Sequence, residues 1–220
     1  MQKFKAVLFD LDGTLADTAP DLAQTLNTLL QENNKPTLAF ELIRPHVSHG
    51  AMALLKLGFP ELEERELFNK YRERFLAIYL DNLTQYSRLF PGMEELLDRL
   101  ESSHLAWGVV TNKPAFLTNP LMEQLNLHNR AKTIISGDTT PNKKPHPEPI
   151  FLACKQAHTE PEHAIYVGDA KRDIQAGNSA GLLTLAALFG YLNEDDQPEL
   201  WNADGLINHP LEISEWIWTD

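Results

Sequence analysis

The chain has 220 residues, of which 43% are hydrophobic and 9% aromatic, so it can bury one substantial core or a main domain with a smaller insert. This composition excludes a chain that is disordered throughout, because the apolar surface suffices to offset the entropy lost on folding. Asp and Glu (31) outnumber Lys and Arg (19), and the net charge of −12 argues against nucleic acid or a membrane surface as a partner.

Short apolar runs alternate with helix-like stretches along most of the chain, which predicts repeated β–α units around a parallel sheet. The runs are continuously apolar, as is typical of strands covered on both faces. The predicted strands are residues 6–10, 105–110, 133–136, 164–167, 182–187 and a short edge strand at 205–207. The predicted helices are residues 93–102, 116–125, 148–157, 173–180 and 211–217.

Residues 17–88 interrupt this rhythm, because no strand-like run occurs there and apolar residues recur at helical spacing. One stripe holds Leu22, Leu26, Leu29 and Leu30, and another holds Leu67, Tyr71, Phe75, Ile78 and Tyr79. The segment is too long for an ordinary connection between strand and helix. We therefore predict a small helical domain at 17–88, inserted into a main α/β domain of residues 1–16 and 89–220.

Two carboxylates follow the first predicted strand in the sequence Asp10-Leu-Asp12-Gly13-Thr14. Residues i and i+2 of extended chain point to the same side, so both can face one ligand. Asp10, beside a divalent cation, suits a nucleophile, and Asp12 can carry a proton to a leaving oxygen. Gly13 lets the backbone turn at once. A polar turn or a calcium loop has a similar pattern, but a calcium loop needs further regularly spaced acids and a flanking helix on each side.

Polar residues also follow the later strands. Thr111 and Asn112 end the second strand, where a hydroxyl can bind a phosphate oxygen, although an innocent turn or helix cap has the same residues. Lys144 lies in a loop stiffened by three prolines and can neutralise a phosphoryl group; Lys143 is its neighbour and competitor. Asp169 ends the fourth strand and is a predicted metal ligand.

Asp173, four residues after Asp169, begins a predicted helix. A favourable interaction with the helix dipole therefore explains an acidic residue at this position almost as well as a role in metal binding does. All these residues lie at predicted carboxyl ends of strands, the edge at which open parallel sheets bind ligands. Oxygen ligands from Asp10, Asp12 or a nearby carbonyl, Asp169 and Asp173 suit Mg²⁺ as the cofactor.

The chain resembles the haloacid dehalogenase-like phosphatases, whose four motifs are similar to Asp10-Leu-Asp-Gly-Thr14, Thr111-Asn112, Lys144-Pro and Gly168-Asp169 with Asp173. The resemblance implies a Rossmann-like three-layer core, Mg²⁺, and hydrolysis of a small phosphorylated metabolite through an aspartyl phosphate on Asp10. It also implies that Asp12 is the general acid and base, that Thr111 and Lys144 bind phosphate, and that residues 17–88 are a helical cap.

The branch that it resembles contains phosphoglycolate phosphatases and β-phosphoglucomutases. The sequence around its motifs is at least as similar to that of N-acetylmuramic acid 6-phosphate phosphatases as to that of phosphoglycolate phosphatases. A phosphomutase shares the first chemical step, so the motifs leave that alternative open. A non-catalytic protein of the same fold is a third reading, which no residue supports.

Within the predicted cap, residues 44–50 combine a cation, two imidazoles and a glycine. Arg44 could pair with a substrate carboxylate, and His49 and Gly50 could contribute to substrate binding, although a solvated turn between helices explains the same residues. The single cysteine, Cys154, excludes an internal disulfide and suits a reducing compartment. We expect a cytoplasmic protein, since the apolar run at residues 6–9 is too short for a signal peptide.

Overall fold

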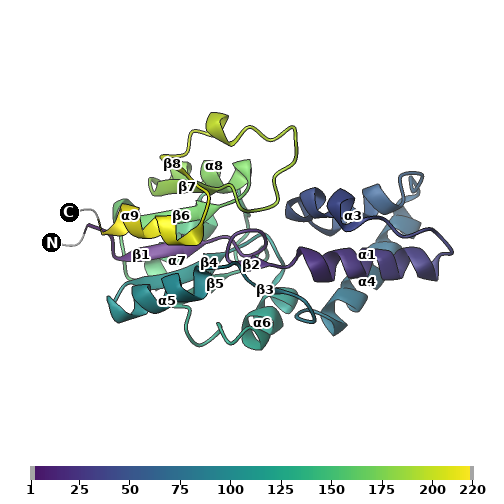
Figure 1. Ribbon diagram of the computed structural model, residues 1–220, viewed down its shortest axis with the longest axis horizontal. Coiled ribbons are helices and arrows are strands. Elements are labelled where there is room, and N and C mark those ends of the chain that lie inside the picture. The colour runs from purple at the N-terminus through teal and green to yellow at the C-terminus, as the bar shows by residue number, and fades with distance from the viewer. Residues whose placement is uncertain (1–2, 219–220) are drawn as a thin grey trace.

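The computed structural model describes residues 3–218, in which a parallel sheet lies between two layers of helices and a group of further helices lies beyond one end of the strands (Figure 1). The strands follow one another across the sheet in the order β5 (Thr133–Ile135), β4 (Ala106–Val110), β1 (Ala6–Phe9), β6 (Ala164–Gly168), β7 (Leu183–Ala187) and β8 (Gly205–Ile207). Every neighbouring pair is parallel. The chain fills the β4 side of β1 first and the β6 side afterwards, so the strand order reverses at β1.

Both faces of the sheet are buried, which explains why the strands lack alternation of apolar and polar residues. In β1, Val7 and Phe9 belong to one apolar core, and Ala6 and Leu8 belong to the other. The first core is completed by α5 (Met93–Ser102), α6 (Ala115–Gln124) and α9 (Ile213–Ile217). The second is completed by α7 (Glu148–Gln156) and α8 (Lys171–Ala180). Short 3₁₀ segments are η2 (Pro161–His163), η3 (Pro198–Leu200) and η4 (Pro210–Glu212).

The helical insert, by which we mean residues 18–87, is packed around the apolar stripe of its first helix. Its elements are α1 (Ala19–Glu32), α2 (Phe40–Ile43), η1 (Arg44–His49), α3 (Gly50–Gly58) and α4 (Arg65–Asp81). The stripe of Leu22, Leu26, Leu29 and Leu30 is buried, as are Phe75, Ile78 and Tyr79 on α4. Each fully buried side chain of this size contributes roughly 1.5–3 kcal/mol. The insert therefore has an apolar interior, and it lies to the right of the sheet in Figure 1.

The insert is joined to the rest of the molecule by a two-stranded antiparallel ribbon. Strand β2 (Ala16–Asp17) leaves the core and pairs with the returning strand β3 (Arg88–Leu89), so that Asp17 stands opposite Arg88. Beside the ribbon, the buried Asp21 accepts hydrogen bonds from the backbone N–H and the hydroxyl of Ser87 at 2.8 and 2.6 Å. The outgoing and returning segments are therefore held together at one place.

The sequence-based predictions of the fold class, the six strands and the helices of the core are confirmed, with ends that differ by one or two residues. The helix predicted at 173–180, for example, begins at Lys171. Strands β2 and β3 were not predicted; at two residues each, they are too short to give a pattern. The division into domains at 17 and 88 stays a prediction.

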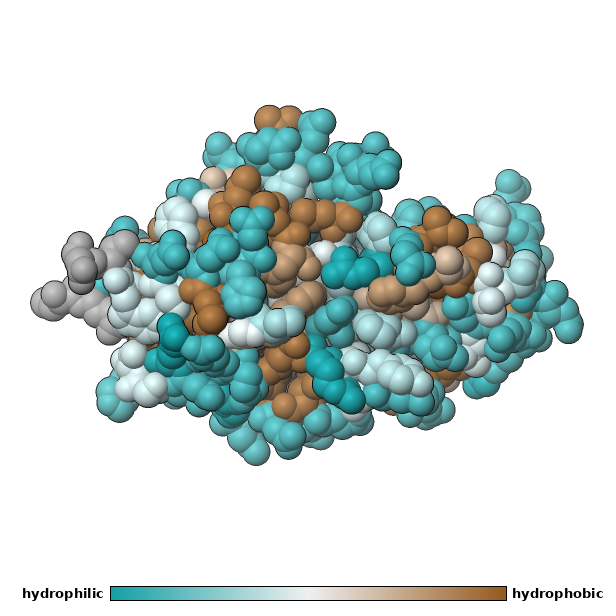
Figure 2. All heavy atoms as spheres, viewed as in Figure 1, coloured by the Kyte–Doolittle hydropathy of each residue, from teal (hydrophilic) through white to brown (hydrophobic). Residues whose placement is uncertain are grey.

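Hydrophilic residues cover most of the face shown in Figure 2, and apolar residues gather in separate patches on it. Among residues 3–218, no helix combines the length and the apolar character needed to cross a membrane.

Candidate active site

The polar residues singled out in the sequence meet at the carboxyl edge of the sheet, beside the strand where the order reverses. Asp10 directly follows β1, Thr111 follows β4 and Asp169 follows β6. The loop that contains Lys144 reaches the same place, since Lys144 Nζ lies 2.9 Å from Asp10 Oδ1. Four segments far apart in the chain thus converge, as expected for a ligand site at a reversal of strand order.

Three buried carboxylates form the centre of this site. Asp10, Asp169 and Asp173 each offer an oxygen, and the three oxygens lie within 4.8 Å of one another. Burial, together with the charges of Asp10 and Asp173, raises the pKa of Asp169 to about 7. Burial and Asp10 also raise the pKa of Asp173. The arrangement is therefore electrostatically unfavourable without further positive charge.

This group of carboxylates fits a hard divalent cation. Its donors are all oxygens, as Mg²⁺ prefers. Asp173 Oδ1 is buried and has no aligned hydrogen-bond donor within residues 3–218, although Lys144 Nζ lies 2.7 Å away. The carboxylate of Asp12, which we also predicted as a ligand, lies outside the group. Its Oδ1 instead accepts hydrogen bonds from Lys113 and Thr18.

Lys144 is the fully buried cation of the site. Its ammonium group pairs with Asp10 and Asp173 and donates to the carbonyl of Val110 and to the hydroxyl of Tyr166, both at 2.8 Å. The amide of Asn112 holds the Lys144 backbone through two hydrogen bonds of 2.9 and 3.0 Å. Asn112 thus positions the lysine. Lys143, the competing candidate, is exposed.

Glycines allow the loops to approach one another. Gly13 has a φ of +87°, and a Cβ built there would lie 2.2 Å from Asp169 Oδ2. A Cβ on Gly168 would lie 2.3 Å from the Cβ of Asp173. Larger residues at either position would displace a carboxylate of the group. The positive φ of Gly13 agrees with the tight turn that the sequence predicts, and Gly168, at the end of β6, leaves room for the close approach of Asp173.

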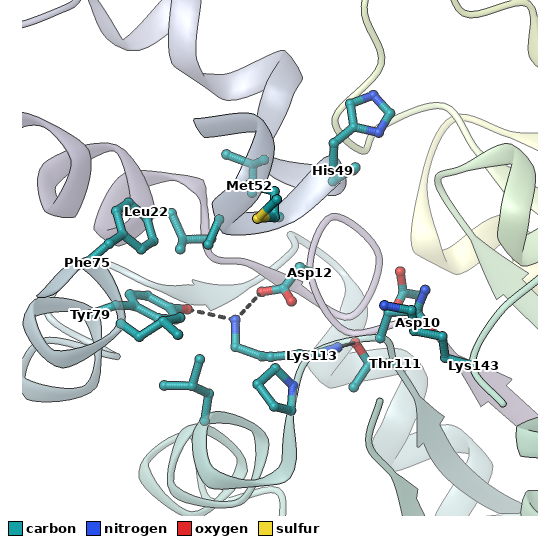
Figure 3. A pocket seen from close by; sticks show the side chains of 18 of the residues that line it. Asp10, Asp12, Leu22, His49, Met52, Phe75, Tyr79, Thr111, Lys113 and Lys143 are labelled. Atoms are coloured by element: carbon teal, nitrogen blue, oxygen red, sulfur yellow. Dashed lines mark hydrogen bonds and ion pairs between the residues drawn. The ribbon is translucent and has the colours of Figure 1, made fainter. Parts of the chain in front are cut away.

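The side chain of Asp12 is held by a residue that the sequence analysis did not select. Lys113 Nζ lies 2.8 Å from Asp12 Oδ1 and 2.9 Å from the hydroxyl of Tyr79, as Figure 3 shows. Asp12 and Tyr79 raise the pKa of Lys113 although its burial opposes this shift, and burial raises the pKa of Tyr79 to about 12. Lys113 follows Thr111 in the core, whereas Tyr79 belongs to α4. The ammonium group therefore links the insert to Asp12.

Thr111 is buried at the entrance to the loop after β4. Its Oγ1 accepts a hydrogen bond of 3.2 Å from the backbone N–H of Lys113. The hydrogen of the hydroxyl thus remains available for an acceptor in the cavity. This is the geometry expected of a donor to a phosphate oxygen.

A cavity of about 370 Å³ separates this edge of the sheet from the insert. Asp10, Asp12 and Thr111 line its core side, while His49 and Gly50 line its insert side. Arg44, predicted to bind a substrate carboxylate, is not among the lining residues. Its Nη1 donates to the carbonyl of Gly190 at 2.9 Å, and the guanidinium stacks on Tyr191. In this structure Arg44 contacts the core loop after β7, so the prediction of its direct role does not agree with its position.

The insert also contributes Ser48, whose hydroxyl donates to Asp169 at 2.7 Å. Arg172 on α8 donates to the carbonyl of Ser48 at 2.7 Å and lines the cavity. The sequence analysis missed both. Ser48 lies within the segment of residues 44–50 that it did select, and Arg172 lies between Asp169 and Asp173, so their neighbourhood was the only available signal.

Comparison with known proteins agrees with this geometry. The family model described as haloacid dehalogenase-like hydrolase matches residues 7–187. A protein of Pseudomonas putida named N-acetylmuramic acid 6-phosphate phosphatase is 42% identical over 98% of this chain and 96% of its own length. A protein of Xanthomonas campestris pv. campestris named phosphoglycolate phosphatase is 40% identical over 96% of this chain and 95% of its own length.

A solved structure is similar throughout. The crystal structure of a protein from Haemophilus somnus 129PT, described as a predicted phosphoglycolate phosphatase, has a TM-score of 0.88 with this chain and 28% sequence identity to it. The match covers 99% of this chain and 100% of the other. The core and the helical insert are thus both present in that structure.

Proposed function

The chain belongs to the haloacid dehalogenase-like hydrolases, and we propose that it is a magnesium-dependent phosphatase that acts on a small phosphorylated acid through an aspartyl phosphate formed on Asp10. One observation carries this proposal: Asp10 is a buried carboxylate that lies beside a buried lysine and two further carboxylates. The roles of the individual residues below, and the expected cytoplasmic location, are parts of the proposal.

The nucleophile is oriented by its own loop. Asp10 Oδ1 accepts from the backbone N–H of Leu11 at 2.8 Å and pairs with Lys144. Asp10 also lines the cavity. Its second oxygen can therefore attack the phosphorus atom, while the bond from phosphorus to the substrate alcohol breaks. Asp12 gives its proton to the departing alcohol.

The second half of the reaction releases inorganic phosphate. Asp12 takes a proton from a water molecule, which attacks the phosphorus atom of the aspartyl phosphate and returns Asp10 to its carboxylate form. Thr111 and Lys144 hold the phosphoryl oxygens during both steps. Asp10, Asp169 and Asp173 would hold Mg²⁺, which supplies further neutralisation of the charge on the phosphoryl group.

The relatives suggest two substrates of different size, 2-phosphoglycolate and N-acetylmuramic acid 6-phosphate. Both combine a phosphate monoester with a carboxylate. A phosphomutase is the alternative of another class, since it shares the first chemical step and differs in where the phosphoryl group goes next. The insert should decide among these substrates, because the residues of the sheet edge handle only the phosphoryl group.

Two measurements test the proposal. In one, the enzyme is mixed with each substrate and Mg²⁺, and released inorganic phosphate is compared with substrate consumed; we expect equal amounts. In the other, the reaction is quenched in acid during turnover, and mass spectrometry should find one phosphoryl group on the peptide that contains Asp10. An isomerised sugar phosphate in place of free phosphate would identify a mutase. Phosphate release with no modified Asp10 peptide at any time would argue against the covalent intermediate.

A further inference from the structure

One basic residue on the insert side of the cavity has no use in the reaction described above. Arg72 lies on α4 in the insert, and its side chain is exposed at the cavity wall. Its guanidinium forms no hydrogen bond or ion pair with any residue between 3 and 218. The other lysines and arginines of the wall belong to the core: Lys113 pairs with Asp12, Arg172 donates to the carbonyl of Ser48, and Lys143 lies exposed in the loop beside Lys144.

The position of Arg72 follows from the helix. Arg72, Phe75, Leu76 and Tyr79 all line the cavity, and their spacing of three, one and three residues places them on one face of α4. Seven residues separate Arg72 from Tyr79, which corresponds to about 10 Å along the helix axis. Helix α4 ends at Asp81, shortly before the chain returns to the core through β3, so Tyr79 lies toward the core and Arg72 away from it.

The cavity therefore has two differently charged ends. At one end it is lined by Asp10, Asp12 and Thr111. Between the ends, Phe75 and Leu76 give an apolar wall. At the far end Arg72 presents one positive charge in a protein whose net charge is −12. His49 adds little charge at neutral pH, because partial burial and the nearby Arg172 lower its pKa. One guanidinium matches one monoanion, and its planar fork matches a carboxylate.

We infer that Arg72 binds a carboxylate on the substrate alcohol at the end remote from the phosphoester, so that the preferred substrate is an acid sugar phosphate or a phosphorylated acid of similar length. This inference rests on the proposed phosphatase function and narrows its substrate class. A two-carbon acid, such as the one in 2-phosphoglycolate, has its carboxylate next to the phosphoester and does not extend to Arg72.

A matched pair of substrates isolates the carboxylate. N-acetylmuramic acid 6-phosphate differs from N-acetylglucosamine 6-phosphate by a lactyl group that carries the carboxylate. We would measure kcat/KM for both, and for 2-phosphoglycolate, in wild-type protein and in Arg72→Gln, Arg72→Lys and Arg74→Gln. Arg74→Gln is the control, because Arg74 lies on the same helix but pairs with Glu32 at 2.5 Å outside the cavity, and its replacement changes the net charge equally.

For Arg72→Gln, kcat/KM toward N-acetylmuramic acid 6-phosphate should fall about tenfold, whereas the values for the two other substrates should change less than about twofold. Arg72→Lys should restore part of the loss, since it keeps the charge without the fork. Arg74→Gln should leave all three values unchanged.

Equal loss on both sugar phosphates in Arg72→Gln, or no loss on either, would overturn the role of Arg72 while leaving the phosphatase function in place. We would also compare wild-type protein on fructose 1,6-bisphosphate and fructose 6-phosphate, which differ by one phosphate. If the bisphosphate is preferred by a larger factor than N-acetylmuramic acid 6-phosphate is over N-acetylglucosamine 6-phosphate, and Arg72→Gln abolishes that preference, then Arg72 binds a second phosphate. That result would overturn the inference as stated. Release of no phosphate from any of these substrates would overturn the proposed function and the inference together.

Discussion

Lys144 at the sheet edge and Arg72 on the insert side of the cavity are held in different ways. At the sheet edge, Lys144 is buried and has four partners, and two hydrogen bonds from Asn112 fix its backbone. Across the cavity, Arg72 is exposed and has no partner within residues 3–218. The first arrangement suits chemistry, in which charges must be placed before the reaction begins. The second suits recognition, in which a side chain gains its partner only when the substrate arrives. Substitutions at the sheet edge should therefore lower activity toward every substrate, whereas substitutions on the insert side should lower it only toward particular substrates.

The largest effect is expected at the nucleophile. Asp10→Asn should lower kcat by at least about 10³-fold for every substrate, because the amide cannot attack phosphorus, while the melting temperature stays the same or rises through loss of one buried charge. Steady-state kinetics and thermal unfolding measure both. Asp98→Asn, on the exposed face of α5, is the control and should retain activity. A substrate that Asp10→Asn still turns over at the normal rate would refute the assignment.

The next largest effect separates two adjacent lysines. Lys144→Met should lower kcat about 100-fold or more and reduce the free energy of unfolding by about 3 kcal/mol, because it leaves Asp10 and Asp173 without their buried cation. Lys143→Met, at the exposed neighbouring position, should cost only a few-fold. Urea unfolding and kinetics on both variants make the comparison. If Lys143→Met were the more damaging change, the phosphate-binding lysine would be misassigned.

A smaller effect is expected where the two regions touch. Lys113→Met removes the ion pair that orients Asp12, and should lower kcat roughly 10- to 30-fold. Tyr79→Phe keeps that ion pair and removes only the link to α4, so it should cost about threefold or less. The ratio of the two losses measures how far the insert, as opposed to the core, positions Asp12. Equal losses would mean that the contact with α4 is the essential one.

The carboxylate group should respond to metal and pH without substrate. Folding raises the pKa of Asp169 from about 3.9 in the unfolded chain to about 7. Between these values the folded protein retains a proton that the unfolded chain has lost, so in metal-free protein this group destabilises the fold as pH rises through that window. Mg²⁺ binds the deprotonated carboxylates. A saturating concentration should therefore raise the melting temperature by about 5–10 °C at pH 8 and much less at pH 5.

Differential scanning fluorimetry with Mg²⁺ or EDTA at the two pH values measures this shift. Asp169→Asn should show little of either dependence, since it removes both a ligand and the titrating group. A Mg²⁺-induced shift that is equal at both pH values would contradict the proposed ligands.

The smallest effect concerns Arg44. Arg44→Gln removes its hydrogen bond to the carbonyl of Gly190 and should change kcat/KM about threefold or less, equally for N-acetylmuramic and N-acetylglucosamine 6-phosphates. The same assay as for Arg72 provides the comparison. A loss confined to the substrate with the carboxylate would restore the direct role first predicted for Arg44.

The sequence alone was sufficient to predict the strands of the core, because strands covered on both faces give unbroken apolar runs. It also selected Asp10, Lys144 and Asp169, since each directly follows or lies near such a run. The sequence could not predict the direction in which individual side chains point. The carboxylate of Asp12 turns toward Lys113, and the guanidinium of Arg44 turns toward the loop after β7.

Those orientations depend on contacts between the insert and the core, whose residues are far apart in the sequence. Lys113 and Tyr79 are separated by 34 positions, and Ser48 and Asp169 by 121. No periodic pattern or local motif reports such pairs. Arg72 was overlooked for a related reason, because a basic residue on an amphipathic helix reads as solvated surface until the opposite wall of the cavity is known.

The ribbon of β2 and β3 lets the chain leave and re-enter the core at one place. The chain leaves the core at Asp17 and returns at Arg88, and these residues face each other across one strand spacing of about 5 Å. Antiparallel strands at that distance can be closed by a short turn or by a long excursion without change to their register. A segment of another length or shape could therefore join the same two positions and alter the set of alcohols admitted, but it would have to replace the contacts that Ser48 and Tyr79 make with Asp169 and Lys113.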